Sequence, residues 1–207
     1  RLGVRCAPYH AGLTAHERSR AQEQFLNEDL DVIVATVAFG MGIDRSDVRF
    51  VVHGSLPKGL EQYSQETGRA GRDGLASECV LLHSGADYFS WKNLLERSHA
   101  EAQATGAAGD PAQLAGALAR LGEMRNFATR LVCRHRQLVE HFGQRLETRD
   151  CGACDVCLGE IESVTGGTVL AQKILSAVVK VGQRYGAGHV ADVLRGAATA
   201  ALARAAH

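Results

Sequence analysis

The decapeptide Gln65-Glu66-Thr67-Gly68-Arg69-Ala70-Gly71-Arg72-Asp73-Gly74 combines two arginines, three residues apart, with three glycines. Because glycine tolerates a left-handed backbone and close contacts, this stretch can turn sharply and direct both guanidiniums at one target. A guanidinium binds phosphate through paired hydrogen bonds. We interpret the stretch as an arginine finger that meets a nucleotide γ-phosphate supplied by another domain. A glycine-rich surface turn with solvated arginines is the alternative.

Apolar segments on either side of this decapeptide alternate with helical ones. β-branched and apolar residues predict strands at 2–8, 31–36, 48–53 and 78–82. Thr14 and Glu17 form a capping-box pattern, which predicts a helix ending near Asn27. Residues 61–66 predict a short polar helix. This alternation indicates an α/β fold, a parallel sheet with crossover helices, over residues 1–86.

The run Ala35 to Asp44 follows a strand that we expect to be buried on both faces. Loops at this position carry the binding sites of α/β sheets. The run offers glycines for close backbone approach, a hydroxyl at Thr36 and a carboxylate at Asp44. Alone it is a weak signal, and it gains specificity from the arginine turn that follows.

The pattern becomes helical after the last predicted strand. Asp87 predicts the cap of a helix that continues to about Arg97, and Asp110-Pro111 predicts the start of another. Helical spacing continues, with interruptions, to about residue 142. We expect a helical domain over 87–160 and a further helical region, capped by Thr168, over 166–207.

Four of the six cysteines are spaced Cys-x17-Cys-x2-Cys-x2-Cys: Cys133, Cys151, Cys154 and Cys157. A compact loop with this spacing can fold around a thiolate held on a helix and surround a tetrahedral zinc ion. Such clustering favours a metal site in a reducing compartment over a disulfide framework. An iron–sulfur cluster also takes four thiolates. Four unrelated buried thiols are the third alternative.

Basic side chains are in excess around the cysteines, with seven arginines against three glutamates in residues 120–149. These arginines are Arg120, Arg125, Arg130, Arg134, Arg136, Arg145 and Arg149. The excess could follow a nucleic-acid backbone, and Arg134 and Arg136 are our candidate contacts. A solvated helix face with internal ion pairs explains the excess equally well.

The composition is that of an ordinary globular chain, with 207 residues, 45% hydrophobic and 22% charged, and zero formal net charge. Zero net charge argues against a highly basic protein surface but is compatible with a local basic groove. No apolar run reaches the ~20 residues that span a bilayer, and no signal peptide is recognisable. Since the chain begins at Arg1 rather than Met, we expect a fragment.

Three segments resemble successive motifs of the second RecA-like domain of superfamily 2 helicases, and their sequences are most similar to those of the RecQ family. They are Tyr9-His10-Ala11-Gly12-Leu13, Ala35 to Asp44 followed by Val48 to His53, and Gln65 to Gly74. The four cysteines resemble the RecQ zinc domain. Residues 171–186 and 193–196 resemble the opening of its winged-helix domain, from which residues 197–207 depart.

The resemblance implies an ATP-dependent 3′-to-5′ DNA helicase of recombination, repair and replication. It implies that Arg72 is the arginine finger and that Arg69 and Gln65 link the nucleotide to the domain interface. The remaining implied contacts are Gly42 and Asp44 to the nucleotide, and Thr36 and Gly42 to the DNA strand.

Neither a Gly-x4-Gly-Lys-Ser/Thr P-loop nor an Asp-Glu-x-His motif occurs in these residues. In such helicases both belong to a first RecA-like domain, which we expect to precede Arg1 and to hold ATP and Mg²⁺. This fragment alone is therefore expected to be inactive, with the missing domain as its partner in cis. The other expected partners are single-stranded DNA, duplex junctions and single-stranded-DNA-binding protein. A bacterial, cytoplasmic and nucleoid-associated protein, with no membrane contact, is implied.

A second interpretation is a zinc-stabilised DNA-binding or interaction module without ATPase activity. A P-loop in the coding sequence upstream of Arg1 would separate the two interpretations. An RNA helicase core is disfavoured because it would not explain the cysteines.

Overall fold

The computed structural model describes residues 3–36, 45–105, 110–161 and 164–197. The chain forms two compact units, Arg1–Leu158 and Gly159–His207. Each unit is described by itself below.

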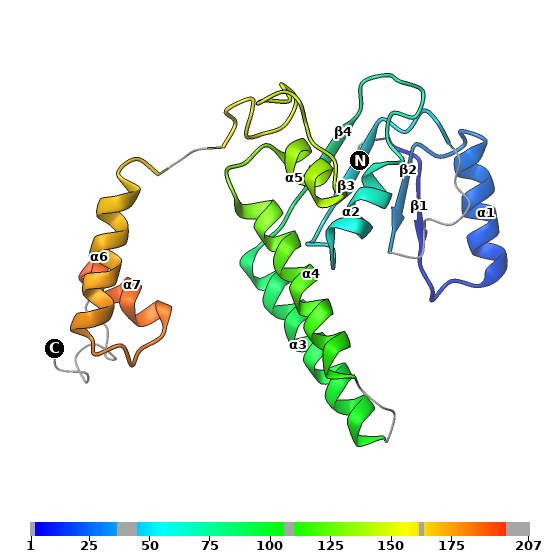
Figure 1. Cartoon of the computed structure of the whole chain (residues 1–207). Coiled ribbons are helices and arrows are strands. Elements are labelled where there is room, and N and C mark those ends of the chain that lie inside the picture. Colours follow the sequence, from blue (N-terminus) through cyan, green and yellow to red (C-terminus); the bar gives the residue numbers. More distant parts are fainter. Residues whose placement is uncertain (1–2, 37–44, 106–109, 162–163, 198–207) are drawn as a thin grey trace. The chain divides into compact units, whose positions relative to one another are not determined.

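Parallel strand pairs form the sheet layer of the first unit (Figure 1). The pairs are β1 (Cys6–Tyr9) with β2 (Val32–Ala35), and β3 (Phe50–His53) with β4 (Glu78–Leu81). Helix α1 (Ala15–Leu26) connects the first pair, and α2 (Leu60–Thr67) connects the second. The predicted α/β fold with parallel strands and crossover helices is confirmed, although each strand is shorter than its apolar segment.

The start of α1 forms as its sequence predicts. The Glu17 backbone N–H donates to Thr14 Oγ1 at 3.2 Å, and the Thr14 N–H donates to Glu17 Oε2 at 2.8 Å. These two bonds satisfy amides that a helix terminus otherwise leaves without partners. Ala21 and Phe25, on one face of the helix, are buried. The capping box therefore sets the first turn, and the spacing of Ala21 and Phe25 sets the face that α1 buries.

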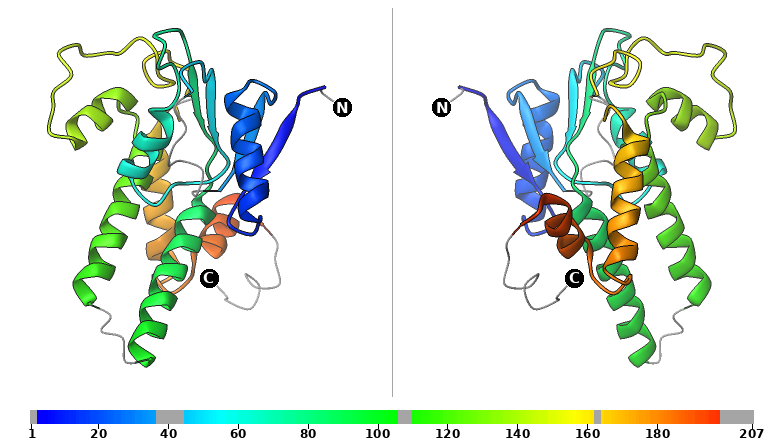
Figure 2. Two further views of the ribbon diagram at one scale, coloured as in Figure 1. Left: turned by 90° about the vertical axis from the view of Figure 1, so that its right-hand side faces the viewer. Right: turned by 90° about the vertical axis from the view of Figure 1, so that its left-hand side faces the viewer.

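Two long helices, α3 (Gly85–Ala104) and α4 (Pro111–Thr129), lie side by side in both views of Figure 2. Asp110 caps α4 as predicted, accepting the Ala112 N–H at 2.9 Å. The start of α3 corrects the prediction that Asp87 is its cap, because Ser84 is the N-cap and Asp87 is the third helical residue of a capping box. The helix also continues well beyond Arg97.

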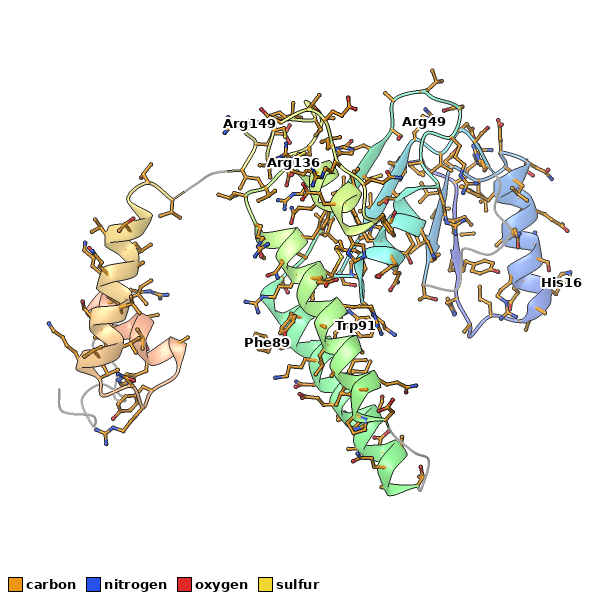
Figure 3. All side chains as sticks on the ribbon, in the orientation of Figure 1. His16, Arg49, Phe89, Trp91, Arg136 and Arg149 are labelled. Atoms are coloured by element: carbon orange, nitrogen blue, oxygen red, sulfur yellow. The ribbon has the colours of Figure 1, made fainter. Side chains whose placement is uncertain are left out.

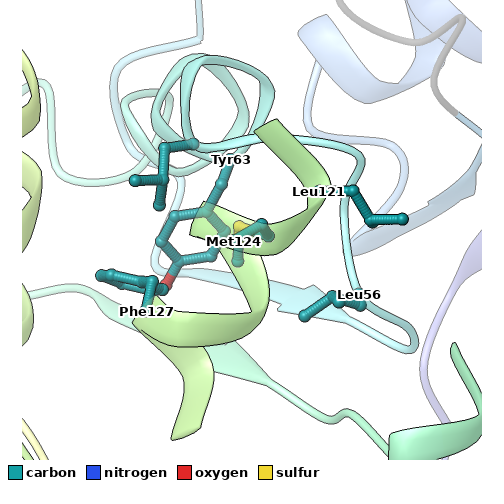
Figure 4. Close-up of a cluster of buried hydrophobic side chains, with 6 residues drawn as sticks. Leu56, Tyr63, Leu121, Met124 and Phe127 are labelled. Carbon is teal, nitrogen blue, oxygen red and sulfur yellow. The ribbon is translucent and has the colours of Figure 1, made fainter. Parts of the chain in front are cut away.

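The main core of the first unit lies between α2, α4 and the segment before α2 (Figure 4). Its buried side chains are Leu56, Leu60, Tyr63, Leu121, Met124 and Phe127. Trp91 of α3, labelled in Figure 3, packs against this core, and its indole N–H donates to the Leu56 carbonyl at 2.8 Å. The same core thus holds residues from both sides of the predicted domain boundary at 86–87.

The second unit is a helix pair, α6 (Gly167–Lys180) and α7 (Ala187–Arg195), closed by Ala177, Val181 and Val190. The prediction that Thr168 caps α6 is wrong. Gly166 holds the cap position with φ of 72°, a left-handed conformation that glycine adopts without strain.

Candidate metal centre and arginine turn

The four clustered cysteines come together at the start of α5 (Arg134–His141), for which Cys133 is the N-cap. Their Sγ atoms all lie within 4.8 Å of one another. Cys133 and Cys154 are buried, and Cys151 and Cys157 are half-buried. The structure therefore brings together all four predicted metal ligands, from a helix terminus and one loop.

This donor set fits zinc. A Zn–S distance of about 2.3 Å in a tetrahedron requires sulfurs about 3.8 Å apart, and the four sulfurs here lie within 4.8 Å of one another. Gly152 takes φ of 65° between two of the cysteines, which gives the loop its tight turn. With four thiolates in place, no coordination position remains for water or a substrate, so the site is structural.

The thiol of Cys154 is prepared for metal binding. Burial raises its pKa, but hydrogen bonds from the backbone N–H groups of Arg134 and Cys157 lower it, with a net pKa of about 7. The Arg134 N–H lies 3.4 Å from Cys154 Sγ. Since zinc binds the thiolate, this shift reduces the free energy needed to remove the proton near neutral pH.

Arg134 joins the cysteine loop to α4. Its Nε and Nη2 donate to the two carboxylate oxygens of Asp155, at 2.9 and 3.0 Å. Its Nη1 donates to the carbonyls of Phe127 and Arg130, and the guanidinium also lies over the Phe127 ring. This paired geometry lowers the pKa of Asp155 and fixes the loop against the end of α4.

Arg136 anchors the segment that leads into Cys151. Its Nη2 donates to the carbonyls of Thr148 and Arg149, at 2.9 and 2.8 Å, and Figure 3 labels Arg136 and Arg149 on these neighbouring segments. Arg134 and Arg136 thus serve protein acceptors in the structure. Contact of these two arginines with DNA phosphate stays a prediction, and their protein contacts weigh against it.

The arginine turn is anchored on both sides of Arg72. The Gly71 N–H donates to the Val48 carbonyl at 3.0 Å. Arg49 Nη2 donates to both carboxylate oxygens of Asp73, at 2.6 Å each, and the Leu75 backbone N–H donates to Asp73 Oδ1 at 3.1 Å. Gly71 has φ of 65°, and a Cβ there would lie 2.6 Å from Ser77 Oγ and 3.0 Å from the Leu75 carbonyl oxygen, so a larger residue would be strained and would displace its neighbours. Conformation and space therefore both favour glycine here.

The predicted nucleotide-contacting side chains lie at the end of α2 and in this turn. Gln65 and Arg72 are exposed and Arg69 is half-buried. Arg72 Nε donates to the Gly68 carbonyl at 3.2 Å. Arg69 Nε is buried and has no hydrogen-bond partner among the residues that the structure describes. The turn therefore carries two arginines in different environments.

Thr36 lies directly after β2, is exposed, and donates its backbone N–H to the Tyr9 carbonyl at 3.1 Å. Gly42 and Asp44, the other predicted contacts of this loop, lie outside the described residues.

Two ion pairs of the sites were missed by reasoning from the sequence. Asp155 lies 21 positions from Arg134, and Asp73 lies 24 positions from Arg49. The only available signal was position, since Asp155 lies inside the cysteine loop and Asp73 inside the arginine turn.

Among the residues placed by the structure, no helix is both long enough and apolar enough to cross a bilayer.

Three family profiles match consecutive parts of the chain. They are the helicase conserved C-terminal domain at residues 1–74, RecQ zinc-binding at 85–158 and the RQC domain at 162–207. The second profile covers the four cysteines and, with the sulfur cluster, decides for zinc over an iron–sulfur cluster.

Curated relatives match almost the whole chain. ATP-dependent DNA helicase RecQ of Pasteurella multocida is 42% identical over 94% of this chain, and that of Bacillus subtilis is 42% identical over 93%. The chain spans only 29% and 31% of the lengths of these relatives. A solved structure of S. cerevisiae Dbp5 gives a weaker likeness, at 24% identity over 46% of this chain and 26% of that chain, with a TM-score of 0.39. Because all three profiles and both relatives agree, the chain belongs to the RecQ family and contains its helicase C-terminal, zinc-binding and RQC regions.

Proposed function

We propose that this chain forms the C-terminal part of an ATP-dependent DNA helicase with 3′-to-5′ polarity, and that it completes an ATP site held mainly by another domain. The observation that carries the proposal is the arginine turn. Exposed Arg72 follows a glycine whose left-handed backbone and close neighbours disfavour a side chain, and it precedes an aspartate paired with Arg49. A backbone held at both neighbours can aim a guanidinium at a phosphate.

Arg72 acts as the arginine finger, stabilising charge on the transferring phosphoryl group. Arg69 and Gln65 connect the nucleotide to the domain interface. Arg69 Nε supports this role, since it is buried without a partner among the described residues, and a nucleotide or a docked domain would satisfy it. Thr36, Gly42 and Asp44 complete the link between ATP and one DNA strand.

Residues 1–207 contain no P-loop and no Asp-Glu-x-His motif. ATP and Mg²⁺ are held with a partner RecA-like domain in cis, and this chain alone does not hydrolyse ATP. An arginine finger stabilises charge only on a nucleotide that a phosphate cradle and Mg²⁺ already hold.

The chain divides into a helicase region over 1–86, a zinc region over 87–160 and the beginning of a winged helix over 166–207. The first two regions share the core between α2 and α4, so they pack together in one compact unit. Zinc would be held by Cys133, Cys151, Cys154 and Cys157, where it supplies folding free energy.

The proposal is tested with the whole gene product that carries this chain, purified beside residues 1–207. ATP turnover and unwinding of a duplex with a 3′ single-stranded tail are measured for both. We expect DNA-stimulated turnover and unwinding only in the whole product. Turnover by residues 1–207, or a whole product that binds DNA and zinc but turns over no ATP, would contradict the proposal.

A further inference from the structure

His135 lies in the first turn of α5, between the two arginines that hold the cysteine loop. Its Nδ1 lies 3.1 Å from the Sγ of Cys151. The imidazole is exposed, and the four sulfurs form their cluster without it. We propose that His135 is a positioning residue of the metal centre, whose Nδ1–H donates a hydrogen bond to the Cys151 thiolate.

The chemistry of the centre favours such a donor. Four thiolates around one Zn²⁺ leave a net charge of about −2 on the cluster. Hydrogen bonds to the sulfurs spread this negative charge and orient each ligand. The backbone N–H of Arg134 already serves Cys154 in this way, at 3.4 Å. His135 provides the corresponding donor for Cys151, which is half-buried and lies at the start of the loop.

The helical turn that carries the donor is fixed to the cysteine segment by the arginines on either side of His135. Arg134 fixes one side of α5 to the loop through Asp155, and Arg136 fixes the other through the carbonyls of Thr148 and Arg149. His135 stands between these two anchors on the same helical turn. A hydrogen bond on such a rigid support loses little conformational entropy when it forms.

The competing role is direct coordination, because three thiolates and one imidazole also form structural zinc sites. The geometry argues that His135 hydrogen-bonds a ligand and does not bind the metal. All four sulfurs lie within 4.8 Å of one another, so they supply the four ligands of a tetrahedral ion without the imidazole. The role of His135 is independent of helicase activity, so its test needs only the folded chain and a metal ion.

The first measurement is the zinc affinity of residues 1–207, by competition with a chromophoric chelator. His135→Phe keeps an aromatic ring without a donor, and His135→Ala removes the ring. His135→Asn places an amide N–H near the position of Nδ1. His16→Phe, at an exposed histidine of α1, is the matched control.

We expect His135→Phe and His135→Ala to weaken zinc binding about tenfold or more, and His135→Asn to stay within about threefold of the parent. If the His135→Phe and His135→Ala variants do not fold while His135→Asn folds and binds zinc, that result also shows that a hydrogen-bond donor is required. Unchanged zinc affinity in the Phe and Ala variants would overturn the proposal, as would an Asn variant as weak as Ala.

The second measurement is the absorption spectrum of the Co²⁺-loaded protein, which distinguishes four sulfur ligands from three sulfurs and one nitrogen. We expect a four-sulfur spectrum in the parent, unchanged in type in His135→Asn. A parent spectrum with one nitrogen ligand, lost on substitution of His135, would make the histidine a ligand and refute the proposal.

Discussion

The guanidinium of Arg134 holds the carboxylate of Asp155 through two parallel hydrogen bonds, at 2.9 and 3.0 Å. The Arg134 side chain is only 14% exposed, so few waters could replace the carboxylate. The pair links the cysteine loop to the start of α5, and the second arm of the guanidinium reaches the end of α4. Arg134 therefore links the metal site to the end of α4, which lies in the core of the first unit.

Asp155→Asn should destabilise the zinc region without removing a ligand. The change leaves the nearly buried Arg134 charge without its anion, and hydrogen bonds to charged groups contribute about 1.5–3 kcal/mol. We expect a loss of about 2 kcal/mol in the free energy of unfolding, measured by urea denaturation of the zinc-loaded chain. Glu147→Gln, at an exposed carboxylate of the same region, is the control. Equal losses in both variants would show that the pair contributes nothing specific.

Removal of zinc should unfold the segment from Cys133 to Leu158 rather than stop one chemical step, because α4 keeps its place in the main core. The loop between Cys151 and Cys157 is too short to form a core of its own. Cys154→Ser should abolish zinc retention by elemental analysis and lower the helical signal in circular dichroism. Cys6→Ser, at an exposed cysteine of β1, should change neither quantity. A metal-free parent with the same melting temperature would contradict a structural role, and iron in the purified protein would contradict zinc.

Arg72→Ala in the whole gene product should lower ATP turnover about a thousandfold or more, with nucleotide affinity largely retained. The reason is that an arginine finger acts on charge that develops in the transition state. Steady-state turnover and fluorescent-nucleotide binding measure the two quantities. Arg20→Ala, at an exposed arginine of α1, is the control. Turnover close to that of the parent would remove Arg72 from this role.

Phosphate contacts should come from exposed arginines of the zinc region rather than from Arg134 and Arg136. Arg145→Gln with Arg149→Gln should weaken binding to all DNA sequences alike and reduce the slope of log affinity against log salt by up to about 2. Arg134→Gln with Arg136→Gln should mainly lower the free energy of unfolding of the zinc region, because both arginines bind protein acceptors. If the second pair reduces the salt slope at unchanged stability, the original assignment of those two arginines holds.

One tyrosine should ionise late in an alkaline titration. Burial raises the pKa of Tyr63 to about 12, from an ordinary 10.0. Since the folded state keeps this proton longer than the unfolded state, the contribution of Tyr63 to stability is present below pH 10 and lost as pH rises towards 12. Tyrosinate absorbance should show a late step that is missing in Tyr63→Phe, and stability between pH 10 and 12 should fall less steeply in that variant. A titration without that late step would contradict the assignment.

The elements whose signals are local could be predicted from the sequence. The capping box at Thr14 and Glu17, the proline start of α4 and the parallel α/β order all depend on neighbours within a few positions or on a short period. The two errors at helix starts share one cause, since several polar residues near each start could serve as the cap. Backbone geometry selected Ser84 over Asp87 and Gly166 over Thr168.

The sequence by itself determined the metal ligands and the arginine turn, because cysteine spacing and a glycine-rich turn are properties of a short stretch of chain. Only the tertiary structure decided which charges pair. Arg134 meets Asp155 and Arg49 meets Asp73 across more than 20 positions. The physical reason is that a charged side chain finds its partner through space, by burial and paired geometry, and neither quantity has a period in the sequence.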